Sequence, residues 1–141
     1  MAAMDEREWR AFLSEGTRTA KLATTRRDGR PHVAPVWFIL EGDEIVFNTG
    51  RDTVKGRTIA RDRRVALCVD DDRPPFAFVL VEGIASASED HDDLLDVATR
   101  IGARYMGEAR GENFGRRNAV EGELVVRVAI VRVVAQKDVS D

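Results

Sequence analysis

The 141-residue chain has a single cysteine, Cys68, and only two histidines, His32 and His91. One cysteine excludes an internal disulfide and any zinc site built from several cysteines. His91 lies in the acidic run 89–93, but adjacent residues at a helix start point in different directions around the axis, so we expect no metal site. The apolar strand segment 64–69 around Cys68 predicts a buried structural thiol.

Long apolar runs are also missing. No stretch approaches the roughly 20 residues that span a bilayer, and acids precede any apolar run at the N-terminus, unlike in a signal peptide. We therefore expect no membrane segment and a cytoplasmic protein. With 43% hydrophobic and 33% charged residues, residues 1–141 are expected to form one globular domain. The net charge of -3 argues against nucleic-acid binding, which needs an extended basic surface.

Lysine is scarce, since Lys21, Lys55 and Lys137 are the only three among 22 basic residues. Lys55 lies in the segment 51–64, whose six basic and two acidic residues give it a local charge of +4. Thr49 and Thr53 supply hydroxyls beside it, Gly50 permits close backbone approach, and a helix is expected to begin near Thr53. A helix N-terminus attracts anions, and a lysine adds a mobile charge. The segment predicts a phosphate cradle; the alternative is a capped, solvated surface helix.

Apolar periodicity predicts a mainly β protein with helices at its margins. Helices are expected at 5–15, ending at Gly16, and at 90–106, and the segment 107–123 is expected to be a polar loop. Strands are expected at 19–25, 30–40, 44–49, 65–70, 76–88 and 124–135, with an Asp28-Gly29 hairpin turn and a bulge at Gly83. Six antiparallel strands predict a small barrel, because closure removes exposed edges; an open sheet packed on helices is the alternative.

The last of these strands is apolar on both faces. Arg127 and Arg132 are five residues apart and would point to opposite faces of a regular strand. Either a bulge intervenes or both faces are partly covered, as they would be by a second subunit.

Pro31 and Pro35 interrupt the expected second strand. Proline cannot donate a ladder hydrogen bond, so it belongs at an edge or a bulge. The backbone groups of Val36 and Trp37 would then be free to pair with the polar edge of a flat heterocycle, with Trp37 as an aromatic wall. The alternative is that Trp37 belongs to the core and Pro35 only blunts an edge.

The order of these parts resembles the pyridoxamine 5'-phosphate oxidase-like flavin-binding split β-barrel family. The resemblance covers about residues 8–134 and rests on LATTRRDGRPHVAPVWF, EIVFNTGRDTVKGRTIARDRRVAL and FVLVEGIA. It implies a six-stranded antiparallel split barrel that forms a homodimer, with cofactor sites at the subunit interface. The implied cofactor residues are Val36 and Trp37 at the ring, Thr49, Gly50, Thr53, Lys55 and Arg57 at the phosphate, and the partner subunit's Phe76 or Phe78 on the other side.

The redox members of this family move a hydride, which is chemistry of the cofactor, so the resemblance implies no dedicated catalytic residue. The chain ends in AQKDVSD, without the Arg-rich and aromatic tail by which pyridoxamine phosphate oxidases bind their substrate, so we do not expect that activity. The RDRRVAL segment is more similar to the actinobacterial branch that uses the deazaflavin coenzyme F420. The high ratio of arginine to lysine is typical of GC-rich genomes and agrees with such a source.

The longer anionic tail of that coenzyme would occupy Arg51, Arg57 and Arg61. We therefore expect an oxidoreductase that transfers a hydride between coenzyme F420 and a small unsaturated organic substrate. The alternatives are an FMN-dependent reductase or oxidase of the same fold, or a non-catalytic carrier of flavin or deazaflavin.

Overall fold

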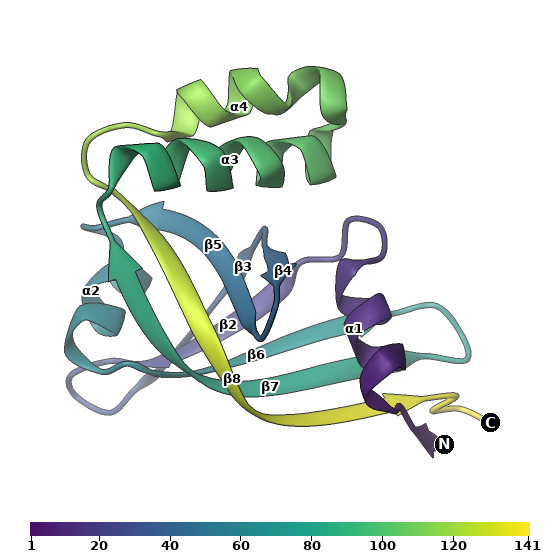
Figure 1. Ribbon diagram of the computed structural model, residues 1–141. Coiled ribbons are helices and arrows are strands. Elements are labelled where there is room, and N and C mark those ends of the chain that lie inside the picture. Colours follow the sequence, from purple (N-terminus) through teal and green to yellow (C-terminus); the bar gives the residue numbers. More distant parts are fainter.

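The computed structural model describes residues 1–141 as a split antiparallel barrel with four α-helices around it (Figure 1). The strands are β1 (Ala2–Ala3), β2 (Ala20–Thr25), β3 (Pro31–Val36), β4 (Ile39–Glu41), β5 (Glu44–Gly50), β6 (Arg64–Asp71), β7 (Ala77–Ser88) and β8 (Glu123–Lys137). The helices are α1 (Glu6–Ser14), α2 (Val54–Arg61), α3 (His91–Met106) and α4 (Gly111–Asn118), with a 3-10 turn at Glu108–Arg110. The predicted fold class is confirmed, although the structure has eight strands rather than six.

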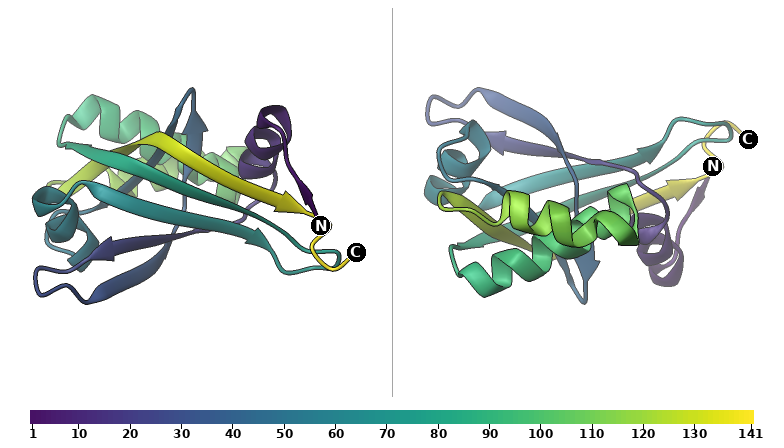
Figure 2. Two further views of the ribbon diagram at one scale, coloured as in Figure 1. Left: turned by 90° about the horizontal axis from the view of Figure 1, so that it is seen from below. Right: turned by 90° about the horizontal axis from the view of Figure 1, so that it is seen from above.

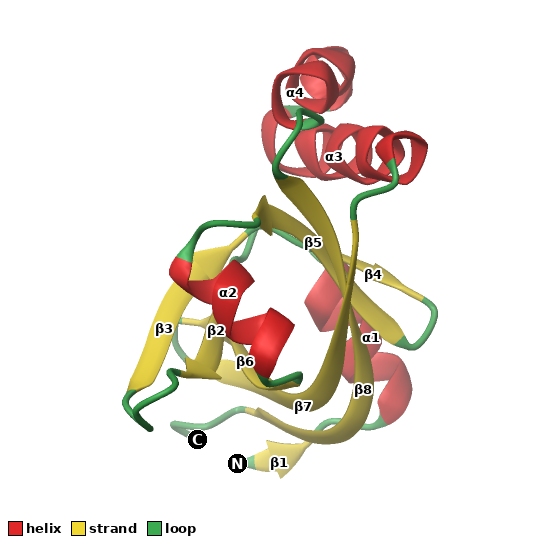
Figure 3. Ribbon diagram, turned by 90° about the vertical axis from the view of Figure 1, so that its left-hand side faces the viewer, coloured by secondary structure: helices red, strands yellow, loops and turns green.

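The strands follow the order β3-β2-β6-β7-β8-β5-β4, and β1 pairs with β8. Inward-facing side chains from every long strand form the barrel core, which includes Leu22, Phe47 and Leu67. α1 and α2 cover opposite ends of the barrel and add Phe12 and Ile59 to this core (Figure 3). No helix of the protein has the length and apolarity to cross a membrane.

The expected strand 30–40 is wrong in one respect, because it is broken at Trp37 and Phe38 into β3 and β4. Two α3 side chains hold the break open. The Phe38 N–H donates to the Tyr105 hydroxyl at 3.2 Å, and the Arg104 guanidinium donates to the Phe38 carbonyl at 2.6 Å. Since Phe38 gives both of its peptide groups to α3, it cannot continue the ladder.

The segment 107–123 is not a loop, as we had expected, but contains α4, which lies antiparallel to α3 (Figure 2). The two helices approach so closely that side chains are excluded at the contact. A Cβ on Gly102 would lie 2.6 Å from the Phe114 Cβ, and one on Gly115 would collide with Thr99. Glycine disfavours an isolated helix, so α4 depends on packing against α3.

A bulge is present at Gly83 as predicted, since the β7–β8 register shifts between Glu82 and Gly83, but its extra residue is Val131 of β8 and not a residue of the strand that contains Gly83. Arg127 pairs with Ser86 and Arg132 with Glu82, two positions on the same face of β7. A bulge, the first of the two alternatives, therefore places both arginines on one face.

The outer face of the sheet carries several exposed apolar side chains. Val33, Leu80, Ile84 and Val131 are exposed to between 37% and 68%. The register of β6 with β7 places Cys68 opposite Leu80, and the thiol is only half-buried. The prediction of a buried thiol was wrong, because Cys68 faces outward on a strand whose inner face packs the core.

Candidate functional site

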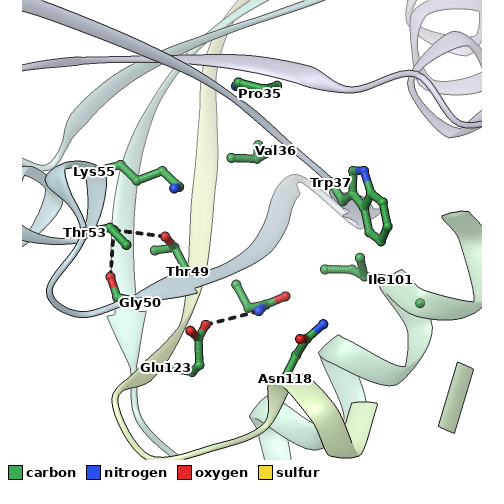
Figure 4. Close-up of a pocket in the computed structure, with 12 residues that line it drawn as sticks. Pro35, Val36, Trp37, Thr49, Gly50, Thr53, Lys55, Ile101, Asn118 and Glu123 are labelled. Atoms are coloured by element: carbon green, nitrogen blue, oxygen red, sulfur yellow. Dashed lines mark hydrogen bonds between the residues drawn. The ribbon is translucent and has the colours of Figure 1, made fainter. Parts of the chain in front are cut away.

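A pocket of about 380 Å³ lies in the split of the barrel, between the end of β3 and the part of β5 that follows Val46, which β4 does not pair. Residues of α2, α3 and α4 complete its wall (Figure 4). Six of the predicted site residues line it: Val36, Trp37, Thr49, Gly50, Thr53 and Lys55. The structure therefore brings together two groups that are separated in the sequence, one at the end of β3 and one at the start of α2.

The N-terminus of α2 borders the pocket. Thr53 caps the helix, since its hydroxyl accepts from the Gly56 N–H at 3.1 Å and donates to the Gly50 carbonyl at 2.8 Å. The Thr49 hydroxyl lies 3.2 Å from that of Thr53. The N–H groups of Val54 and Lys55 have no partner within the protein, so they are available to an anion.

Lys55 is the only lysine without a carboxylate partner. The ammonium of Lys21 lies 2.9 Å from Asp70, and that of Lys137 lies 2.9 Å from Glu8. Lys55 makes no ion pair or side-chain hydrogen bond, and its ammonium points into the pocket (Figure 4). It therefore supplies an uncompensated positive charge beside the helix N-terminus.

Free peptide groups line the split on its β5 side. The bonds Ile130 N–H to Asp43 C=O and Arg51 N–H to Gly122 C=O fix which β5 residues bond to β8. By the alternation of an antiparallel ladder, the peptide groups of Asn48 and the N–H of Gly50 point away from β8. They face the split, where β5 has no neighbouring strand.

On the β3 side the free groups are the peptide groups of Trp37 and the carbonyl of Pro35. The bond from the Arg26 N–H to the Arg30 carbonyl sets the alternation along the β2–β3 ladder. Val36 then falls on a hydrogen-bonded pair with Ala20, whereas Pro35 faces the free edge of the sheet. The expectation of free peptide groups at Val36 is corrected: Val36 contributes its buried side chain to the pocket.

Trp37 lies at the opposite end of the pocket from Lys55 (Figure 4). Its ring stacks on Tyr105, with centroids 4.9 Å apart and planes at 2°, and Phe114 approaches at 6.2 Å. The Tyr105 hydroxyl donates to the Arg18 carbonyl at 2.7 Å, and burial raises the pKa of this phenol. Trp37 is therefore not a core residue, since it is 38% exposed, but one face of its ring is held by α3.

Three predicted site residues lie outside this pocket. Arg57 lines a second pocket of about 330 Å³ together with Arg26, Arg27 and Arg61. Phe76 precedes β7 and Phe78 is its second residue, and both contact the C-terminal segment, since Val139 donates to the Phe76 carbonyl and Phe78 pairs with Gln136. The start of β7 lies on the side of the molecule where the termini lie, away from α2 (Figure 1). Within one subunit these two aromatic side chains do not reach the pocket.

Three polar residues that line the pocket were not predicted from the sequence: Asn48, Asn118 and Glu123. The Asn48 amide donates to a Glu123 carboxylate oxygen at 3.3 Å. Glu123 comes to the pocket because it pairs with Gly50 across β5 and β8, and Asn118 because α4 exists. Both facts depend on tertiary structure, so no signal within a single sequence marks these residues. No group of three or more His, Cys, Asp or Glu side chains is arranged to hold a metal ion.

The chain is similar to several solved structures. It superposes on a conserved hypothetical protein from Mycobacterium tuberculosis with a TM-score of 0.83 and 26% identity, over 96% of this chain and 86% of that one. It superposes on an F420 reductase with a TM-score of 0.68 and 24% identity, over 87% of this chain and 94% of that one. It superposes on a heme storage protein from Vibrio cholerae with a TM-score of 0.74 and 19% identity, over 96% of this chain and 98% of that one. A search of curated proteins gives no significant match.

The family model described as pyridoxamine 5'-phosphate oxidase matches residues 5–137. That match includes the helix α1, every long strand and all the residues that line the pocket. It agrees with the order of sequence segments and with the split-barrel topology. The chain therefore belongs to the pyridoxamine 5'-phosphate oxidase family.

Proposed function

We propose that the protein is an oxidoreductase that binds the deazaflavin coenzyme F420 in the pocket between β3 and β5 and reduces a small unsaturated organic substrate. The observation that carries the proposal is the polarity of this pocket. One end offers an unpaired ammonium, two hydroxyls and a helix N-terminus, and the other offers a free peptide beside Trp37. A molecule with a phosphate at one end and a flat, polar-edged ring at the other fits both ends.

The residues would divide the task of binding. Lys55, Thr49 and the first N–H groups of α2 would hold the phosphate, and the free peptides of Trp37 and Asn48 would pair with the edge of the ring. The coenzyme itself supplies the hydride-transfer chemistry. Trp37, fixed by its stack on Tyr105, would limit the orientations of the ring and keep water from one end of the pocket.

The arginine pocket beside α2 favours the deazaflavin coenzyme over FMN. FMN ends at its phosphate, whereas the coenzyme continues into an anionic tail that needs further cations. Arg57 and Arg61 line this second pocket with Arg26 and Arg27. Arg51, the third arginine that we had assigned to the tail, is bound to Glu89 at 2.8 Å instead. Similarity to an F420 reductase supports the same choice.

Similarity to a heme storage protein raises the question of a haem group. Haem iron needs an axial ligand such as His, Cys, Met or Tyr. The residues that line the pocket include none of these four types, so their chemistry favours a flavin-like ring.

Equilibrium titration with coenzyme F420 and with FMN tests the proposal. We expect the coenzyme to bind more tightly, and stopped-flow mixing of the bound, reduced coenzyme with unsaturated substrates to accelerate its reoxidation. Tighter binding of FMN would overturn the choice of cofactor. Binding without accelerated reoxidation across a broad substrate panel would instead indicate a carrier.

Lys55→Ala should weaken coenzyme binding by about 1.5–3 kcal/mol, the range for a hydrogen bond to a charged group. Isothermal titration calorimetry measures the loss. Lys137→Ala is the matched control, because it removes a lysine that pairs with Glu8 at the other end of the molecule, and it should leave the affinity unchanged. Equal affinities for the two variants would remove Lys55 from the site.

We further propose that the active protein is a homodimer joined through the apolar outer face of the sheet. This face carries the exposed Leu80 and Ile84, and Phe78 lies on the same side of β7. A second subunit would cover these side chains and bring its β7 aromatics towards the pocket.

Sedimentation velocity should give twice the 15.7 kDa chain mass, and Ile84→Lys should shift the protein towards the monomer and weaken coenzyme binding. Val120→Lys is the control, because it adds the same charge at an exposed apolar position outside the sheet. It should change neither the oligomeric state nor coenzyme binding. A wild-type protein that stays monomeric at micromolar concentration would contradict a site shared between subunits.

A further inference from the structure

The Glu123 carboxylate is a negative charge beside an anion cradle. Glu123 begins β8 opposite Gly50 and lines the same pocket as Lys55 (Figure 4). Its Oε1 lies 3.5 Å from the point that a Cβ on Gly50 would occupy, and Thr53 Cγ2 lies 3.2 Å from the same point. The carboxylate therefore stands next to the helix cap that we assign to the phosphate.

No cation in the protein neutralises this carboxylate. Its only partner is the neutral amide of Asn48, which donates to Oε2, and no lysine or arginine lies within ion-pair distance. Arg51, which follows β5 and donates its N–H to the carbonyl of Gly122, the residue before Glu123, is engaged by Glu89 at 2.8 Å. The pocket thus contains one unpaired cation, Lys55, and one unpaired anion, Glu123.

We infer that Glu123 makes the pocket selective for a singly charged phosphodiester over a doubly charged phosphomonoester. This inference rests on the proposed function, because it assumes that the phosphate occupies the cradle. A single negative charge is balanced by Lys55 and the helix N-terminus. A second charge meets the Glu123 carboxylate, and repulsion between unit charges several ångströms apart weakens binding on the order of tenfold at an intermediate dielectric.

This selectivity would separate the two cofactors that the fold could hold. The phosphate of FMN is a monoester with close to two negative charges at pH 8, since the second pKa of such a group is about 6. The phosphate of the deazaflavin coenzyme is a diester and carries one charge. Glu123 would therefore disfavour FMN without touching its ring.

Three flavins that share one ring and one ribityl chain test the inference: riboflavin, its 5'-methylphosphate diester and FMN, with zero, one and nearly two charges. We expect Glu123→Gln, measured by fluorescence titration at pH 8 and low salt, to leave riboflavin affinity unchanged within about twofold. The affinity for the diester should rise several-fold, and that for FMN should rise about tenfold more than that for the diester. Molar salt should reduce these differences, because it screens exposed charges.

Glu121→Gln is the matched control. It removes the same charge from an exposed residue two positions away that does not line the pocket, so it should leave all three affinities unchanged. An equal change for all three flavins would mean that Glu123 binds the shared ribityl hydroxyls, and no change would mean that it lies outside the site; either result overturns the inference alone. Failure of all three flavins and of the deazaflavin coenzyme to bind either protein would overturn the proposed function and, with it, the inference.

Discussion

Gly56→Ala is expected to lower coenzyme affinity at least tenfold and to destabilise the protein by about 2 kcal/mol or more. A Cβ at this position would overlap the Gly50 carbonyl and lie 3.0 Å from the Arg51 carbonyl. Both are backbone atoms, so α2 would have to move away from the end of β5. Because the cradle consists of the α2 N-terminus and Thr49, a shift of about 1 Å misplaces its donors and is costly.

For Gly56→Ala, steric overlap and helix propensity predict stability changes of opposite sign. In an unconstrained helix interior, alanine is about 1 kcal/mol more favourable than glycine, so a gain in stability would show that the close contact is absent. Ala60→Gly is the matched control on the same helix, since Ala60 is exposed. It should lose about 1 kcal/mol of stability through helix propensity alone and leave coenzyme affinity unchanged. Urea unfolding followed by circular dichroism measures both variants.

Arg104→Met is expected to reduce the free energy of unfolding by about 3–5 kcal/mol. The Arg104 guanidinium donates to three carbonyls, those of Leu13 at 2.8 Å, Gly16 at 3.0 Å and Phe38 at 2.6 Å. Burial lowers the pKa of this guanidinium, and no carboxylate pairs with it. Methionine keeps most of the apolar stem but leaves the carbonyls of the buried residues Leu13 and Phe38 without this donor, each costing roughly 1–3 kcal/mol where water is excluded.

Arg100→Met provides the comparison, one turn earlier on α3. Arg100 pairs with Glu41 at 2.7 Å and with Asp96 at 2.9 Å, but these side chains are 41–61% exposed, so their loss should cost less than about 1 kcal/mol. Similar losses for the two variants, measured by urea unfolding, would show that the three carbonyls find other partners. The distinction matters because Arg104 joins α1, α3 and the β3–β4 break in one contact.

The parts of the fold that depend on neighbouring residues could be predicted from the sequence. The helix ending at Gly16 and the hairpin at Gly29 are present, and both glycines have positive φ, at 61° and 87°. A helix start near Thr53 was also predicted, and the Thr53 hydroxyl caps α2 there. These signals are local, so they survive in a single sequence.

The remaining features depend on contacts between distant segments. α4 was missed because Gly111 and Gly115 argue against a helix until α3 supplies a partner surface. The β3–β4 break was missed because Tyr105 and Arg104 cause it from 66 or 67 positions away. The basic and threonine-rich end of the site could be predicted because its residues are close together in the sequence. Glu123 could not, because the pairing of β5 with β8 brings it to the site.

The break at Trp37 and Phe38 also limits how far the pocket can widen at that end. β3 and β4 are the two ends of the sheet order, and only these two residues connect them, so three peptide units bound their separation to about 10 Å. Near Trp37 the split is therefore tethered by covalent bonds, whereas near α2 no strand pairing joins β3 to β5. Side-chain changes can therefore alter the width of the pocket more readily near α2 than near Trp37, so ligands within this architecture are expected to differ in their tails before they differ in their rings.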